Sequence, residues 1–90
     1  KNSENYYMLD SLAWAYYKKN KLLKAVKIME KVIRIAPAEA ISLDHLGDIY
    51  LKLGRKREAY FMWMQAKALS EPIDDIIDSI QLKIDKFNAG

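Results

Sequence analysis

One histidine and two neighbouring carboxylates form the group of residues in this chain that most resembles a reactive centre. His45 is the only histidine, Asp44 precedes it, and Asp48 follows three residues later. On a helix, His45 and Asp48 would share one face and could both touch a metal ion. Two ligands without a third make a poor metal site, and a Ser-His-Asp triad would have to be built around this one histidine. We therefore interpret His45 as a solvated or hydrogen-bonded histidine.

The other residues of catalytic type have simpler explanations. Asp74 and Asp75 resemble a general acid and base, but they stand at the start of an expected helix, where negative charge is stabilised by the helix dipole. The chain has no cysteine, which excludes disulfides, thiol chemistry and thiolate metal sites. It also lacks a glycine-rich phosphate loop. We expect a non-enzymatic protein with no catalytic residue, no metal site and no cofactor.

A basic run invites a nucleic-acid interpretation, which the rest of the chain does not support. Residues 52–57 read Lys-Leu-Gly-Arg-Lys-Arg. One such cluster without a surrounding basic face gives weak, salt-sensitive binding, and the net charge is only +3, with both signs interspersed. Apolar runs stay well below the ~18–20 residues that a membrane span requires. We interpret the run as a solvated turn and expect neither a nucleic-acid partner nor membrane insertion.

Aromatic residues near the start of the chain define a second helical face. Tyr7, Asp10, Trp14 and Tyr17 are spaced three, four and three apart, whereas Leu9, Leu12 and Tyr16 form a separate core stripe. Exposed Tyr and Trp supply contact area at small entropic cost and are frequent in binding hot spots. Two interpretations stay open: this face binds an extended or helical peptide, or it packs against a preceding structural unit.

The elements that carry these residues repeat along the chain. A shift of 34 residues places Leu9 on Leu43 and Tyr16 on Tyr50. Apolar residues at spacings of three and four predict helices over about 5–19, 22–35, 41–53, 59–69 and 73–88. Asn20 and Gly54 occupy equivalent turn positions. With 51% hydrophobic and 30% charged residues, we expect one folded, all-α domain of stacked helical hairpins.

The pattern within each unit resembles the tetratricopeptide repeat. The second unit carries Leu43, Leu46, Gly47, Tyr50, Ala59, Trp63 and Ala66, and the first carries Leu9, Leu12, Ala13, Tyr16, Ala25, Met29, Val32 and Pro37. Small residues let the two helices of a hairpin approach closely, and large ones fill the holes between hairpins. Met29, Val32 and Glu71 depart mildly from the consensus. The resemblance implies two repeats, over about 6–39 and 40–73, and a capping helix over about 73–88 in a right-handed superhelix.

The resemblance also implies a binding surface. In this family the first helix of each hairpin, the A helix, lines a concave groove. The corresponding residues are Tyr7, Asp10, Ser11, Trp14, Tyr17 and Lys18 in the first unit and Ile41, Asp44, His45, Asp48, Leu51 and Lys52 in the second. We expect a protein-interaction module that binds a peptide or protein segment there. The cationic clamp of chaperone-tail binders is absent, because Asp10 and Trp14 stand at its positions. Asp10, Asp44 and Asp48 indicate a ligand with some positive charge.

A structural role is the alternative function. The runs 9–15 and 43–50 look like the closing repeats of bacterial tetratricopeptide proteins, which suggests the C-terminal segment of a longer array with no ligand of its own. In the fifth helix, Ile76, Ile80, Ile84 and Phe87 belong to an inward apolar stripe, and Lys83 is among the outward polar residues. The first hairpin would then be an exposed face through which the chain forms homo-oligomers. The residues expected there are Tyr6, Tyr7, Trp14, Tyr17, Val26, Met29 and Ile33.

Overall fold

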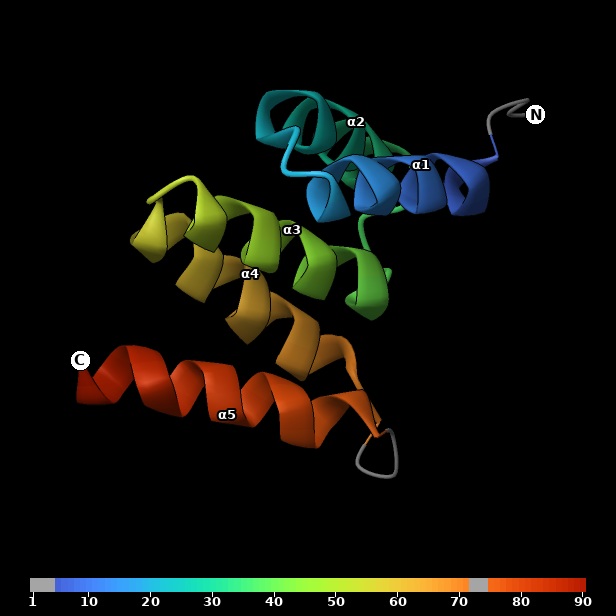
Figure 1. The fold of residues 1–90 in the computed structure, drawn as a ribbon. Helices are drawn as coiled ribbons and strands as arrows, with labels where there is room; N and C mark the ends of the chain where they lie inside the picture. Colours follow the sequence, from blue (N-terminus) through green and yellow to red (C-terminus); the bar gives the residue numbers. More distant parts are fainter. Residues whose placement is uncertain (1–4, 72–74) are drawn as a thin grey trace.

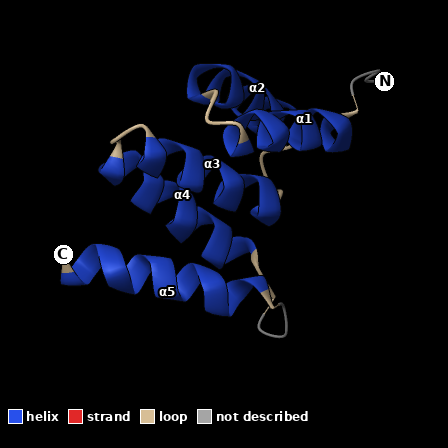
Figure 2. Cartoon of the chain, viewed as in Figure 1, coloured by secondary structure: helices blue, strands red, loops and turns tan. Residues whose placement is uncertain are grey.

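The computed structural model describes residues 5–71 and 75–90 of the chain, and these residues form helices and loops without any strand (Figures 1 and 2). This confirms the all-α prediction. The helices are α1 (Tyr6–Lys18), α2 (Leu22–Ile35), α3 (Ala40–Lys52), α4 (Lys56–Leu69) and α5 (Ile76–Ala89).

The same turn closes both hairpins. The amide of Lys21 donates to the carbonyl of Tyr16, and, 34 residues later, the amide of Arg55 donates to the carbonyl of Tyr50. Each bond spans a residue in the left-handed region, Asn20 with φ 63° and Gly54 with φ 81°. This arrangement satisfies carbonyl groups that the end of a helix leaves without partners. The predicted equivalence of Asn20 and Gly54 is thus confirmed in the backbone.

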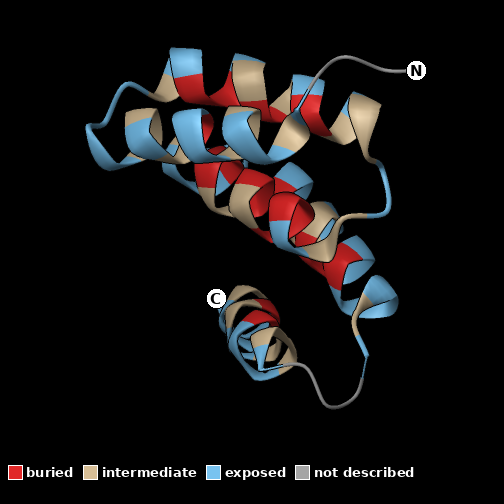
Figure 3. Ribbon diagram, turned by 90° about the vertical axis from the view of Figure 1, so that its right-hand side faces the viewer, coloured by how far each residue is buried: buried red, intermediate tan, exposed pale blue. Residues whose placement is uncertain are grey.

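The helices stack in sequence order as layers of a solenoid. Helices α1 and α2 form one antiparallel hairpin, α3 and α4 form the next, α2 packs against α3, and α5 packs against α4 (Figure 1). Buried residues lie mainly on the sides of the helices that face a neighbour (Figure 3). The buried apolar core comprises Ala13, Ala25, Val26, Met29, Val32, Leu43, Leu46, Ile49, Tyr50, Ala59, Trp63, Ala66, Ile80 and Ile84.

Helix α5 caps the stack as predicted, and within the described residues it begins at Ile76. Ile80 and Ile84 are buried, and the ring of Phe87 stacks on Tyr60 with centroids 4.5 Å apart. The expected start at Ile73 and the acidic residue Asp74 lie outside the described residues. Asp75 directly precedes α5, where the helix dipole favours its negative charge, and its side chain makes no capping hydrogen bond.

Candidate functional site

The sequence-predicted histidine is part of a small polar cluster between α1 and α3. Nδ1 of His45 lies 2.9 Å from Oδ1 of Asp10, and the hydroxyl of Ser42 donates to Oδ2 of the same carboxylate at 2.5 Å. Because a carboxylate can only accept, Nδ1 of His45 carries the hydrogen. The interpretation of His45 as a hydrogen-bonded histidine is therefore confirmed, and its partner lies on the neighbouring A helix.

The predicted aromatic face also packs between these two helices. The ring of Trp14 stacks on His45 with centroids 4.0 Å apart and on Tyr17 at 4.4 Å. All three residues are partly buried. The aromatic residues therefore contact the following A helix, which neither of the two interpretations from the sequence included. Tyr7 does not join this stack: it is 67% exposed and its ring stacks on Tyr6.

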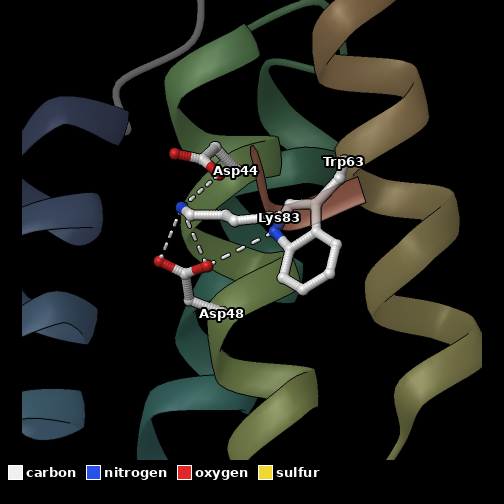
Figure 4. Close-up of polar contacts among 4 residues, drawn as sticks. All are labelled: Asp44, Asp48, Trp63 and Lys83. Carbon is white, nitrogen blue, oxygen red and sulfur yellow. Dashed lines mark hydrogen bonds and ion pairs between the residues drawn. The ribbon is translucent and has the colours of Figure 1, made fainter. Parts of the chain in front are cut away.

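The two aspartates of α3 have a cationic partner within the chain. Lys83 of α5 donates from Nζ to Oδ1 of Asp44 at 2.8 Å and to Oδ2 of Asp48 at 3.1 Å, and Nε1 of Trp63 donates to Oδ1 of Asp48 at 3.3 Å (Figure 4). The side chain of Lys83 retains only 26% of its exposure. Its predicted place among the outward polar residues of α5 is therefore wrong. The expectation of a positively charged ligand also loses its basis at Asp44 and Asp48, because Lys83 already occupies both carboxylates and offsets one of their two charges.

Burial and hydrogen bonding act against each other on these groups. For Lys83, burial alone would lower the pKa, but the bonds to Asp44 and Asp48 outweigh it and raise the pKa. For Asp48, burial dominates and raises the pKa despite the contact with Lys83, since one ammonium serves two carboxylates. For Asp10, burial opposes ionisation, but the hydrogen bonds from His45 and Ser42 prevail and lower the pKa.

The remaining predicted groove residues are accessible. Ile41 is 55% and Leu51 44% exposed, and Lys18 and Lys52 are exposed at the ends of α1 and α3. The ammonium of Lys52 lies 6.0 Å from the centre of the Tyr17 ring. The structure thus divides the predicted site into an engaged part, between α1, α3 and α5, and an open part that flanks it.

An open cavity of about 670 Å³ adjoins the open part. Tyr17 and Leu51 line it together with residues of α4 and α5 that sequence reasoning did not include, among them Arg57, Lys83 and Phe87. One signal was present in the sequence: Lys83 continues the inward spacing of Ile76 and Ile80. A lysine in such a stripe indicates a buried anionic partner.

Within the described residues, no three His, Cys, Asp or Glu side chains gather in a way that could hold a metal ion. A bilayer crossing is likewise not offered by any helix in this part of the chain, because none has the necessary length and apolar character.

These features define a helical-repeat protein whose A helices present a partly open surface. A sequence profile of the tetratricopeptide repeat matches residues 3–39 and 40–71, and the chain belongs to this family. Members of the family generally mediate protein–protein interactions and are generally non-catalytic scaffolds.

Solved structures support the same fold. A crystal structure of a tetratricopeptide repeat domain protein from Salinibacter ruber is similar with a TM-score of 0.86 and 20% identity, covering 96% of this chain and 98% of that one. A solution NMR structure of such a domain protein from the same organism has a TM-score of 0.84 and 20% identity, covering 99% and 92%. A search among curated proteins finds no match.

Proposed function

We propose that this protein binds a peptide segment of a partner protein along the concave surface of α1 and α3. The observation that carries the proposal is the exposure of Ile41 and Leu51 on either side of the engaged residues His45 and Asp48 of α3. Their spacing places all four residues along one strip of the helix. Exposed apolar residues beside satisfied polar groups are typical of a surface that is completed by a ligand.

The stack of Trp14 on His45 supports this proposal from the neighbouring helix. Trp14 and Tyr17 are only partly buried, so both residues retain accessible surface beside the exposed residues of α3. The stack also fixes the side-chain conformations before a ligand arrives. A preorganised aromatic surface loses less conformational entropy on binding.

The test is a selection from a random displayed-peptide library followed by affinity measurement. Selected peptides should lose affinity for a variant with Ile41→Ser and Leu51→Ser. They should retain it for the matched variant Leu23→Ser, since Leu23 is 73% exposed on α2, outside the proposed surface. Failure to select any peptide, or equal losses in the two variants, would contradict the proposal.

A second function, the structural continuation of a longer array, is favoured by one comparison between the repeats. Met8 and Leu12 are 70% and 45% exposed, whereas Ser42 and Leu46, at the equivalent positions of α3, are 3% and 2% exposed. The difference arises because α3 has α2 beside it, while no earlier helix covers α1 in the described part of the chain. We infer that this face of α1 accepts another helical layer.

The exposed face of α1 does not consist of the residues that the sequence predicted for self-association. Val26 and Met29 are buried, and Trp14 and Tyr17 pack beside α3, so these four are not part of the uncovered face of α1. Met8 and Leu12 take their place. If the chain self-associates through this face, sedimentation should detect a dimer that Met8→Glu with Leu12→Glu dissociates. A dimer that resists this double substitution would exclude the face.

A further inference from the structure

The cavity at the C-terminal ends of α3 and α5 has an unusual charge. Four cationic side chains, Lys56, Arg57, Lys83 and Lys86, line it together with one acidic side chain, that of Asp48. Lys83 is committed to Asp44 and Asp48, and its one positive charge offsets one of their two negative charges. Lys56, Arg57 and Lys86 remain, and in the described chain none of these three has an ion-pair partner. The cavity therefore presents an excess of positive charge to whatever enters it.

Two of these cations stand at positions where their charge does not stabilise the fold. Lys56 and Arg57 lie in the first turn of α4, where the positive end of the helix dipole disfavours positive charge. Glu58, the acidic residue of that turn, forms a bidentate pair with Arg55, from Nε to Oε1 and from Nη2 to Oε2. Its charge is thus directed to a residue outside the cavity lining. A ligand that carries negative charge would compensate for the unfavourable position of Lys56 and Arg57.

The walls of the cavity are apolar and aromatic. Leu51, Tyr17 and Phe87 contribute to them, and Leu51 is 44% exposed. The volume of about 670 Å³ lies within the range of about 300–1,000 Å³ that is usual for ligand sites. A free small anion would leave these walls uncovered. A phosphate backbone requires many contacts along a charged stripe, whereas these cations are gathered in one cavity.

From the charge and the walls together, we propose that the cavity binds an acidic residue of a partner peptide, with an apolar neighbour of that residue against Leu51 and Phe87. The inference rests on the proposed function, because Tyr17 and Leu51 belong to both the groove and the cavity. It adds the chemistry of the ligand: the Asp or Glu carboxylate pairs with Arg57 and Lys86. Such pairs form charge-assisted hydrogen bonds, and the guanidinium of arginine can bind a carboxylate with two parallel bonds.

The experiment uses a fluorescein-labelled peptide from the library selection described above, with fluorescence polarisation at physiological salt as the readout. Its Asp and Glu residues are replaced by Asn and Gln in a second peptide. The protein variant carries Arg57→Gln and Lys86→Gln. The matched control carries Lys27→Gln and Lys67→Gln, which removes the same charge from exposed positions outside the cavity lining. A single-stranded DNA oligonucleotide is measured in parallel.

We expect the Arg57→Gln and Lys86→Gln variant to bind the acidic peptide at least about tenfold more weakly, which corresponds to one charge-assisted contact. The amidated peptide should bind the wild type equally weakly and should not distinguish the variants. The melting temperature of Arg57→Gln alone should not fall, since the substitution relieves the dipole repulsion. This last result separates a ligand-binding role from a structural one.

Each other outcome has a defined meaning. If no peptide is selected, the proposed function and this inference both fail. If selected peptides bind through Ile41 and Leu51 but are indifferent to amidation and to Arg57→Gln with Lys86→Gln, the inference alone fails. If the Lys27→Gln and Lys67→Gln control binds the acidic peptide equally weakly, the loss of affinity results from the overall charge of the protein and not from the cavity. Tighter binding of the oligonucleotide than of the acidic peptide would assign the cavity to nucleic acid instead.

Discussion

The indole of Trp63 occupies the space that a side chain at position 47 would need. A Cβ built on Gly47 would lie 2.6 Å from Cδ1 of Trp63 and closer still to Nε1. In the first repeat, the equivalent positions hold Ala13 and Met29, and both are fully buried. Each hairpin thus combines a small residue on its A helix with a large one on its second helix. Glycine, the smaller of the two small residues, faces tryptophan, the larger of the two large ones.

Gly47→Ala should therefore destabilise the protein. Overpacking a well-packed core costs about 1–3 kcal/mol, which exceeds the gain of up to ~1 kcal/mol in helix propensity. Urea unfolding followed by circular dichroism measures the difference. The double variant Gly47→Ala with Trp63→Met copies the first repeat and should recover part of the loss. If Gly47→Ala is neutral or stabilising, the close approach of Trp63 does not limit this position.

The stability that Asp10 contributes should depend on pH. Its pKa in the folded protein is lowered below the ordinary value of 3.8, so its contribution is present above that pH and is lost as the pH falls through the folded pKa. Asp10→Asn should reduce the free energy of unfolding at neutral pH by about 1.5–3 kcal/mol, the range for a hydrogen bond to a charged group. The difference from the wild type should shrink below pH 3.8. A difference that is constant with pH would contradict this role.

Removal of Lys83 should leave the buried carboxylate of Asp44 and the partly buried carboxylate of Asp48 without their cation. We expect Lys83→Met to destabilise the protein by about 1–3 kcal/mol, less than for a fully buried pair because the side chain of Lys83 is 26% exposed. Combining it with Asp44→Asn and Asp48→Asn removes the uncompensated charge and should restore much of the stability. Thermal unfolding of the variants provides the comparison. If the combined variant is the least stable, the contacts contribute through packing and not through charge balance.

The two interhelical turns should respond differently to the same kind of substitution. Gly54→Ala places a Cβ in the left-handed region, at a cost of about 1–2 kcal/mol. Asn20→Gly removes a Cβ from an equivalent turn and should change stability by only a few tenths of a kcal/mol, because asparagine tolerates this conformation. Denaturant midpoints of the two variants are sufficient for the test. Similar losses in both would argue against the shared turn geometry.

Much of the fold could be predicted because its determinants are local. The spacing of Leu43, Leu46 and Tyr50 within a helix, and the positions of Asn20 and Gly54, depend on residues a few places apart. The repetition of these features over 34 residues then indicates how successive units stack. The packing within a hairpin also repeats: Gly47 and Trp63 form a small and large pair at the positions that Ala13 and Met29 occupy in the first repeat.

The candidate site was predictable only in part, since its contacts join residues far apart in the chain. The sequence placed Trp14, Asp10 and His45 on the A helices, and it could not tell that they contact one another across α1 and α3. Trp14 and His45 stack because α1 and α3 lie at a suitable distance from each other. That distance depends on how the whole first hairpin packs.

By itself, the sequence determined that this protein is a helical-repeat solenoid, because periodic burial is encoded in each short segment. The tertiary structure alone decided which charges remain available. Lys83 reaches Asp44 and Asp48 only because α5 packs against α4, and this leaves Arg57 and Lys86 to define the open cavity. The sign of a binding surface is a sum over groups brought together by packing, so it does not follow from the charges in any one helix.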